Sequence, residues 1–450
     1  MTENSLDIER ISRVLGGVPR VSYEAPHVYP LSAPAFMPVA GVVRPTPPRE
    51  PLKLYVHVPF CNYACTFCFY VKQVRAGRTR MERYVAAVRR ELACVPEGTP
   101  LEQLYVGGGT PTALPADLLD EVFDAIDARM PAIAGVSRTV ESSPESLTAE
   151  HVAVLRRRKI ERVSMGIETL DPNLLHAINR RHDRRQAENA VALLLSGGLV
   201  VNVDLMYGFP GQTEATFIAD LDVAAAWGVP SISVYNLRLN EHTPLERVVD
   251  DLERLDLPRL VHWRAMIRRE MEARGYEQVR WHTYVKRTGV PSTFGRAPCV
   301  DGSGPGRQLG VGVSAVSHLG AQVYRNRANL DEYLTCIEEN ATPVDGLFTL
   351  DDADRWTLLL VRTLGDGRPL ARASWVEAFG RSIDEDLGPL LTELIDAELV
   401  GSDDESLFLT DTGRLVYDLI TLAFHPHRAR RWLAERQSVG WEHRGLGATS

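Results

Sequence analysis

The sequence predicts an α/β protein whose short parallel strands alternate with helices and curve into a partial, TIM-like (β/α)6 barrel. Three observations lead to this fold class. Six β-rich runs recur between residues 54 and 237, helical patterns separate them, and glycine and acidic residues collect where the runs end. Alternating strands and helices form parallel sheets through right-handed crossovers. Barrels of this kind carry their chemistry at the C-terminal ends of the strands.

The strands and helices can be assigned in order along the chain. In the first helical pattern, Met81, Tyr84, Val85, Val88 and Leu92 recur at three- and four-residue steps and build one apolar face. The other helical patterns cover about 115–130, 148–158, 184–197 and 213–227. The predicted strands are residues 54–58, 103–109, 138–143, 161–168, 199–208 and 231–237.

The regions on either side of this alternation have a different composition. The first 50 residues are rich in proline, which prevents regular helix or sheet, so we expect an extended arm. After about residue 245 the alternation weakens, and residues 289–310 form a glycine- and proline-rich loop before an apolar strand. From about residue 350 helical patterns enclose one short strand pair, as in a winged helix. The predicted domains are therefore an arm (1–50), the barrel with its loop and following strands (51–345) and a helical domain (346–450).

Composition limits the classes of function. With 44% hydrophobic and 24% charged residues, the 450-residue chain resembles an ordinary soluble enzyme. Its net charge of −9 argues against nonspecific nucleic-acid binding, and the helical domain has no concentrated basic face, so we expect it to pack over the barrel mouth. No apolar run reaches the roughly 20 residues of a membrane helix, and the N-terminus lacks a signal-peptide core. We expect a cytoplasmic monomer with reduced thiols that binds neither nucleic acid nor membrane.

Cys61, Cys65 and Cys68 lie close together in the run YVHVPFCNYACTFCFY, directly after the first predicted strand. Three thiolates at this spacing can bind three corners of one iron–sulfur cube and leave the fourth iron open to a small chelating molecule. The alternative is three unconnected small apolar residues. Half of the chain's six cysteines within eight positions makes that alternative the weaker one.

Chemically useful residues collect at the ends of the other predicted strands. A glycine run ends the second strand, single acids end the third and fourth, and one acid lies within the fifth. Because parallel strands of a barrel end at the same mouth, we expect these side chains to surround one site. The residues are Gly107, Gly108, Gly109, Thr110, Glu141, Glu168, Asp204, Tyr235, Asn236 and Arg238.

Together these motifs resemble the radical S-adenosylmethionine (SAM) enzymes, and most closely the branch related to oxygen-independent coproporphyrinogen III oxidase. The likeness runs over roughly residues 51–430. It is carried by LYVHVPFCNYACTFC, VGGGTPT, ESSPESLT, RVSMGIETLD, INRRH, VDLMYGFPGQT, VYNL, LGVGVSAVS and LTDTGRLVYDLI. The resemblance implies a [4Fe–4S] cluster on the three cysteines, SAM on the open iron, and an external electron donor of the flavodoxin or ferredoxin type.

The resemblance also implies roles for individual residues. For the first SAM it implies Gly108, Gly109 and Glu141, with Tyr55 and Phe67 as flanking aromatic residues and Val316 as a further cofactor contact. The glycines could instead form a plain turn, Glu141 could cap a helix, and either aromatic residue could be core. The branch binds a second SAM, for which the implied residues are Gly109, Thr110, Glu168, Arg180, Asp204 and Arg238. The family usually has glutamine where this chain has Glu168, and Arg180 could be one more surface arginine.

Two departures from the family pattern determine the expected activity. Oxidases of this type carry a further cysteine at the position of Tyr70, and related heme chaperones carry an HisAsn…TyrTrp signature where this chain has APCVDGSGPGRQ. We therefore expect a class C radical SAM methyltransferase, which uses two SAM molecules to methylate or cyclopropanate an sp2 carbon of a small natural-product intermediate. No protein nucleophile is expected. The alternatives are radical SAM decarboxylation of a propionate or another heme-modifying reaction, and noncatalytic heme delivery.

Overall fold

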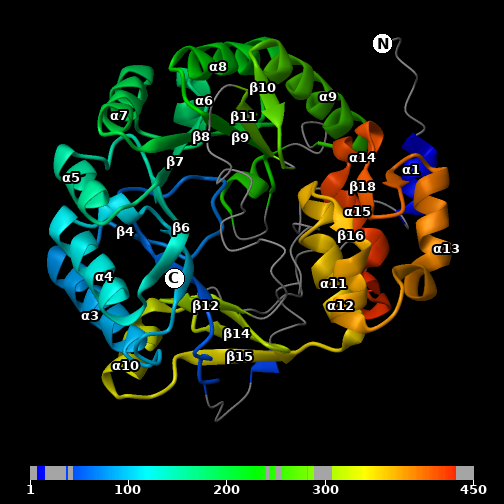
Figure 1. Ribbon diagram of the computed structural model, residues 1–450. Coiled ribbons are helices and arrows are strands. Elements are labelled where there is room, and N and C mark those ends of the chain that lie inside the picture. Colours follow the sequence, from blue (N-terminus) through cyan, green and yellow to red (C-terminus); the bar gives the residue numbers. More distant parts are fainter. Residues whose placement is uncertain are drawn as a thin grey trace. The chain divides into compact units, whose positions relative to one another are not determined.

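The computed structural model describes residues 8–15, 37–38, 44–239, 243–249, 255–280, 282–287 and 307–431 (Figure 1). The chain divides into two compact units. Residues 35–237 and 267–351 form one unit, here called the sheet unit, and residues 1–34, 238–266 and 352–450 form the other, the helical unit. Most of the predicted loop at 289–310 lies outside the described residues, which resume at Arg307.

The sheet unit is built on one large, mostly parallel sheet with the strand order β1-β15-β14-β13-β12-β2-β5-β6-β7-β8-β9-β11-β10. The six predicted strands are neighbours in chain order, and each pairs in parallel with the next. The order is linear, so the sheet is open, as expected for a partial barrel. These strands are β2 (Leu52–Val58), β5 (Leu101–Gly108), β6 (Ala132–Ser142), β7 (Arg162–Glu168), β8 (Val200–Tyr207) and β9 (Ser231–Asn236).

Further strands extend the sheet at both ends. β12 (Arg307–Val311) pairs in parallel with β2, and antiparallel strands follow on that side. They are β13 (Val316–Leu319), β14 (Gln322–Asn326), β15 (Val344–Thr349) and β1 (Met37–Pro38). On the other side β11 (Thr283–Lys286) and β10 (Tyr276–Gln278) are antiparallel, and α10 (Leu330–Glu338) lies between β14 and β15 in the chain.

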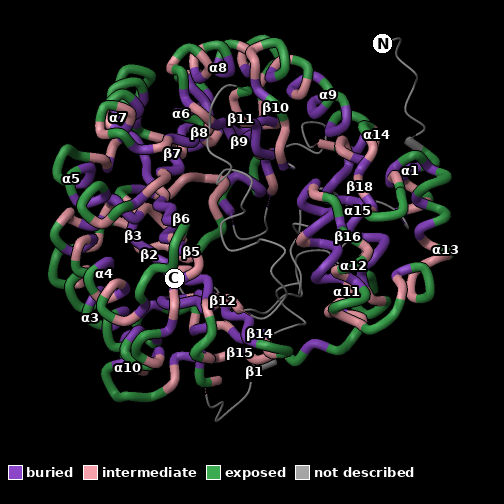
Figure 2. Tube along the Cα trace, in the orientation of Figure 1, coloured by how far each residue is buried: buried purple, intermediate pink, exposed green. Residues whose placement is uncertain are grey.

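Helices connect the parallel strands and line the outer side of the curved sheet (Figure 1). Their inner faces are buried and their outer faces exposed (Figure 2). On α3 four residues of the predicted apolar face, Tyr84, Val85, Val88 and Leu92, are buried, and the fifth, Met81, is half-buried. Local sequence fixes several helix starts: Thr148 caps α5, and capping boxes begin α7 and α8. The helices are α3 (Arg78–Leu92), α4 (Ala116–Arg129), α5 (Ala149–Arg157), α6 (Pro172–Ala177), α7 (Arg184–Ser196) and α8 (Glu214–Ala226).

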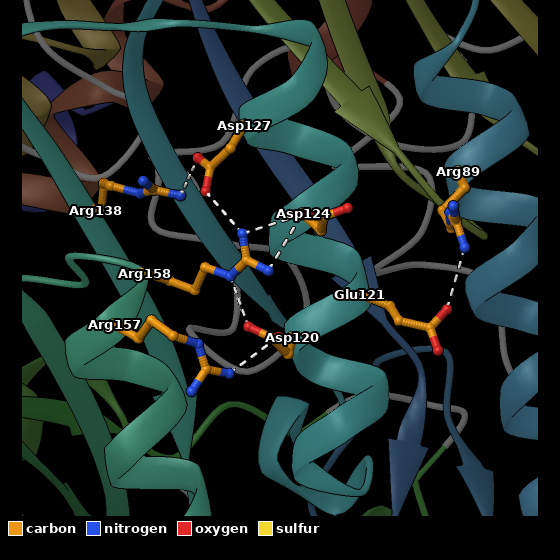
Figure 3. Close-up of polar contacts among 8 residues, drawn as sticks. All are labelled: Arg89, Asp120, Glu121, Asp124, Asp127, Arg138, Arg157 and Arg158. Carbon is orange, nitrogen blue, oxygen red and sulfur yellow. Dashed lines mark hydrogen bonds and ion pairs between the residues drawn. The ribbon is translucent and has the colours of Figure 1, made fainter.

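Ion pairs join neighbouring helices on the outer side of the sheet (Figure 3). Arg158, at the end of α5, reaches Asp120 of α4 at 2.6 Å and Asp124 at 3.2 Å. Arg138 of β6 is buried and pairs with Asp127 of α4 at 2.8 Å. Because one arginine serves several carboxylates, this network fixes α4 against α5 and β6.

The helical unit confirms the predicted helical C-terminal region. A three-stranded sheet in the order β16-β18-β17 is packed among helices, as in a winged helix. Asp418 of α15 is fully buried and binds both Arg238 and Arg264, at 3.1 and 2.8 Å. The elements are α11 (Asp352–Val361), β16 (Leu370–Ala371), α12 (Arg372–Phe379), α13 (Ile383–Asp396), β17 (Val400–Ser402), β18 (Ser406–Leu409), α14 (Asp411–Leu415) and α15 (Tyr417–Phe424). The helix α9 (Leu257–Ala273) contributes its first residues to the helical unit and its last residues, from Ile267, to the sheet unit.

The N-terminal arm is more regular than expected. Helix α1 (Ile8–Val14) precedes the first proline of the chain, and Ile11 and Leu15, one turn apart, are buried. The strand β1 pairs with β15. The proline content therefore excludes regular structure only locally. Within the part of the chain that the structure describes, no helix combines the length and apolarity needed to cross a membrane.

Candidate cofactor-binding site

The three cysteines lie on the loop that follows β2, between the short paired strands β3 (Phe60–Cys61) and β4 (Gln73–Val74). Backbone and side-chain hydrogen bonds fix this loop at both ends. Thr66 N donates to Ile178 O at 3.1 Å, and Asn179 Nδ2 donates to Ala64 O at 2.6 Å. The His57 ring bonds Val71 O at 3.0 Å. These contacts hold the loop through groups other than the cysteine thiols.

Charged and polar groups contact the cysteine loop. Thr110 Oγ1 lies 3.8 Å from Cys61 Sγ, and Arg180 Nη1 lies 3.8 Å from Cys65 Sγ. Burial raises the pKa of the Cys61 thiol to about 11 and that of Cys65 to about 12, while Arg180 opposes the rise at both. Among the described residues, no three acidic, histidine or cysteine side chains could hold a single metal ion. A cubane differs, because each of its three cysteines binds a separate iron.

The glycine run at the end of β5 is packed tightly by the chain's own side chains. A Cβ on Gly107 would lie 2.8 Å from Glu141 Oε2, and one on Gly108, whose φ is +115°, would lie 2.6 Å from His57. A Cβ on Gly109 would lie 2.7 Å from the carbonyl oxygen of Phe60. These positions accept only glycine, and contact of the glycines with SAM stays a prediction.

Glu141, at the end of β6, lies against this glycine run and is half-buried. Its Oε1 accepts a hydrogen bond from the Tyr105 hydroxyl at 2.5 Å, and its Oε2 accepts one from Gly108 N at 3.0 Å. Burial raises the pKa of Glu141 to about 7. Since Thr148 caps the following helix, Glu141 is not a helix cap.

Glu168 and Arg180 form a buried ion pair beside the cysteine loop. The distance from Arg180 Nη2 to Glu168 Oε1 is 3.5 Å, and the two side chains are 8% and 14% exposed. Arg180 also donates to Gly166 O, so it is not one more surface arginine. Burial raises the pKa of Glu168 to about 7. Glu168 has a φ of +68°, a strained conformation for a residue with a side chain, and such strain concentrates at functional sites.

Asp204 lies within β8 and has polar partners on its own and the adjacent strand. It accepts hydrogen bonds from Ser164 Oγ and Asn202 Nδ2, both at 2.7 Å. Burial raises the pKa of Asp204 to about 6. The strand register places Asp204 opposite Gly166 and Glu141 opposite Ser164, so the acids of β6 and β8 lie at the same end of the sheet.

The other predicted site residues are distributed more widely. Tyr55 stacks on Tyr105, with ring centroids 6.1 Å apart, and Phe67 packs on Phe209 at 5.8 Å. Val316 begins β13, in the antiparallel extension of the sheet. Arg238 belongs to the helical unit and pairs with Asp418, so its role in SAM binding stays a prediction.

Sequence reasoning missed His57 and Tyr105 as parts of this site. His57 bonds the Tyr55 hydroxyl at 3.0 Å through its other ring nitrogen, and burial lowers its pKa to about 4. The period-two alternation of β2 and β5 places Tyr55 with His57 on one face and Tyr105 with Gly107 on one face. That alternation could have identified them, had the register between the strands been known.

The residues present fit a [4Fe–4S] cluster and SAM by the chemistry of their donors. Three cysteines on one loop provide thiolate ligands for three of the four irons of a cubane and leave the fourth iron open. Nearby, Glu141, Glu168 and Asp204 provide carboxylates and Arg180 a guanidinium, which suit the ammonium, sulfonium and carboxylate groups of SAM. The three cysteines would hold the cluster, and the charged side chains would hold SAM.

Comparison with known proteins agrees with this donor chemistry. Residues 55–224 match the family model of the Radical SAM superfamily, whose members use a [4Fe–4S] cluster and SAM. The chain is 27% identical over 404 residues to the heme chaperone HemW of Mycobacterium tuberculosis, covering 87% of this chain and 97% of that protein. It is also 27% identical to the oxygen-independent coproporphyrinogen III oxidase of Escherichia coli, covering 84% and 86% of the two chains.

The solved structure of coproporphyrinogen III oxidase (HemN) from Escherichia coli shares this fold. It superposes with a TM-score of 0.71 at 23% identity and covers 84% of this chain. The expectation of a class C methyltransferase is wrong, because the relatives that match almost end to end are heme chaperones and coproporphyrinogen oxidases. Tyr70 and the segment APCVDGSGPGRQ are short local differences, and similarity over some 400 aligned residues outweighs them.

Proposed function

From the radical SAM domain at residues 55–224, we propose that this chain binds a heme-type tetrapyrrole and acts as a heme chaperone that carries a SAM site. The main support is the similarity to proteins named heme chaperones, which extends over 82–87% of this chain and 97–98% of theirs. Likeness of that extent includes the sheet, the cysteine loop and the helical region together. A cytoplasmic location and a monomeric state stay predictions.

An exposed aromatic pair beside the cysteine loop is suited to a flat macrocycle. Phe69 and Tyr70 follow Cys68 directly, are 47% and 56% exposed, and stack with ring centroids 4.7 Å apart and planes 24° apart. Burial is the main cause that raises the pKa of Tyr235 of β9, and the Tyr70 phenol adds to that rise. A planar conjugated ligand can stack on an exposed aromatic face.

The SAM site has its own role in this proposal. A reduced cluster would supply one electron for homolytic cleavage of SAM. Glu141 and Asp204 would bind the cationic groups of SAM, and Arg180, which pairs with Glu168, would bind its carboxylate. Tyr55 and Tyr105 are half-buried and stack on each other beside Glu141.

Oxidation of a porphyrinogen is a second candidate, favoured by one specific observation. The chain is 27% identical to the oxygen-independent coproporphyrinogen III oxidase of Escherichia coli over 84% of its length. Tyr70 stands against this candidate, because the oxidases carry a cysteine there. The two candidates differ in their ligand: a heme chaperone binds hemin without turnover, whereas an oxidase decarboxylates coproporphyrinogen.

Hemin binding tests the proposal. The wild-type protein is expected to bind one hemin with a shifted Soret band, and the Phe69→Ala/Tyr70→Ala double variant is expected to bind about tenfold or more weakly, because two stacking contacts are lost. Ile133→Ala, at the start of β6, removes a side chain of similar exposure (39%) and should bind hemin normally.

One result would contradict the chaperone function, and another would contradict only the assigned contact surface. Absence of hemin binding by the wild-type protein would exclude the chaperone function, and decarboxylation of coproporphyrinogen with SAM and reductant would then establish the second candidate. Unchanged hemin affinity in the double variant would exclude the aromatic pair as the contact surface while leaving the chaperone function intact.

A further inference from the structure

Tyr105 and Glu141 form a short side-chain hydrogen bond between two adjacent strands of the sheet unit. Tyr105 stands on β5 and Glu141 on the adjacent β6, and the phenol donates to Oε1 at 2.5 Å. The opposite oxygen is held by Gly108 N at 3.0 Å. Gly107 leaves room for both side chains, since a Cβ there would lie 2.8 Å from Tyr105 Cε1 and 2.8 Å from Glu141 Oε2. Three residues of β5 therefore fix one carboxylate.

We propose that Tyr105 is a positioning residue that holds Glu141 as a carboxylate, oriented to receive the cationic part of SAM. The proposal rests on SAM binding at Glu141 and is independent of the tetrapyrrole. Tyr105 itself acts through Glu141. A carboxylate accepts the hydrogen bond of the phenol more strongly than a neutral carboxyl group does, so the contact favours the ionised form of Glu141.

The charges around Glu141 make this single hydrogen bond important. Burial raises its pKa to about 7, and the hydrogen bonds from Tyr105 and Gly108 lower it. Arg162 of β7 also lowers the pKa of Glu141, whereas Asp204 of β8 raises it. Glu168 of β7 and Tyr235 of β9 also face this group. Because the resulting pKa of Glu141 is about 7, the carboxyl group is close to half ionised at neutral pH. Loss of the Tyr105 hydrogen bond would therefore make the protonated form predominate.

The direction of the pH effect follows from these contacts. SAM carries a net positive charge, so it binds the ionised form of Glu141 better than the protonated form. Affinity should rise up to tenfold per pH unit below the pKa of Glu141 and level off above it. Without the Tyr105 donor the pKa of Glu141 rises further, by about one unit, so the break in the profile moves to higher pH.

Equilibrium binding of SAM measures this effect without turnover. Protein with a reconstituted, unreduced cluster is titrated with SAM by calorimetry between pH 6 and pH 9, as wild type, Tyr105→Phe, Glu141→Gln and Tyr276→Phe. Tyr276→Phe is the matched control, because it deletes one buried phenol hydrogen bond, to Val229 O at 2.7 Å, on a different strand. Glu141→Gln reports the titration of SAM itself and of all other groups.

Wild type and Tyr276→Phe are expected to show the same break near pH 7. Tyr105→Phe should bind severalfold more weakly at pH 7 and recover near wild-type affinity at pH 9. The same break in Tyr105→Phe as in wild type, with affinity reduced equally at every pH, would reduce Tyr105 to a structural role and overturn the proposal.

Two further results distinguish the role of Tyr105 from the question of whether SAM contacts Glu141. Glu141→Gln is expected to keep only the pH dependence that comes from SAM and from other groups of the site such as Glu168, and a wild-type profile in that variant would show that SAM does not contact Glu141. If Tyr105→Phe does not fold, the carboxylic-acid C=O stretch in infrared difference spectra still tests whether Glu141 is ionised at neutral pH in the presence of its Tyr105 donor. The wild-type protein must then show a band that disappears through pH 7 and is absent from Glu141→Gln.

Discussion

Replacing any one of Cys61, Cys65 and Cys68 with alanine is expected to abolish assembly of the iron–sulfur cluster. Each thiolate serves a separate iron, so a single loss leaves two irons of a cubane without a protein ligand. The loop is held by contacts that do not involve sulfur, such as Thr66 N to Ile178 O and the His57 ring to Val71 O, so the protein should still fold. The defect is therefore expected in the metal site alone.

Iron and sulfide content after anaerobic reconstitution, and the visible absorbance of the cluster, measure this loss. Cys94→Ala provides the control, since this cysteine is exposed just beyond the end of α3, away from the loop. It should reconstitute like wild type. A full complement of iron with SAM cleavage in any of the three loop variants would contradict the assignment of the cluster ligands.

Replacing Arg180 with alanine is expected to lower both stability and SAM affinity. Arg180 and Glu168 are a buried pair, 8% and 14% exposed, and removal of one partner leaves the other charge uncompensated. Such changes cost about 3–5 kcal/mol in the free energy of unfolding. The loss also removes the guanidinium beside Cys65 that opposes the raised pKa of that thiol.

A double variant separates these two roles of Arg180. Arg180→Met/Glu168→Met removes both charges and keeps the volume, so thermal denaturation should return close to wild type. SAM affinity should stay low, because the guanidinium is still missing. Arg78→Ala breaks an exposed ion pair with Asp117 and should change neither quantity appreciably. Wild-type stability and wild-type SAM binding in Arg180→Ala would together exclude a role for this residue in the site.

The error about methyl transfer came from giving too much weight to single positions. Tyr70 departs from the oxidase pattern, which argued against the oxidases. The segment APCVDGSGPGRQ departs from the chaperone pattern, which argued against the chaperones. Tyr70 is exposed and stacked on Phe69, so its replacement of a cysteine alters the surface of the cysteine loop and leaves the three ligands unchanged. One surface position is weak evidence against likeness that spans both units.

The sequence by itself determined the alternation of strands and helices, the three-cysteine loop and the placement of Glu141 and Glu168 at strand ends. These features follow from local periodicity and spacing, which a linear sequence contains. Only the tertiary structure decided that Tyr105 holds Glu141, that His57 fills the space over Gly108 and that Arg180 pairs with Glu168. Those contacts join strands and loops that are distant in the chain. They depend on strand register and on loop paths, and a shift of one residue would turn each side chain to the opposite face of the sheet.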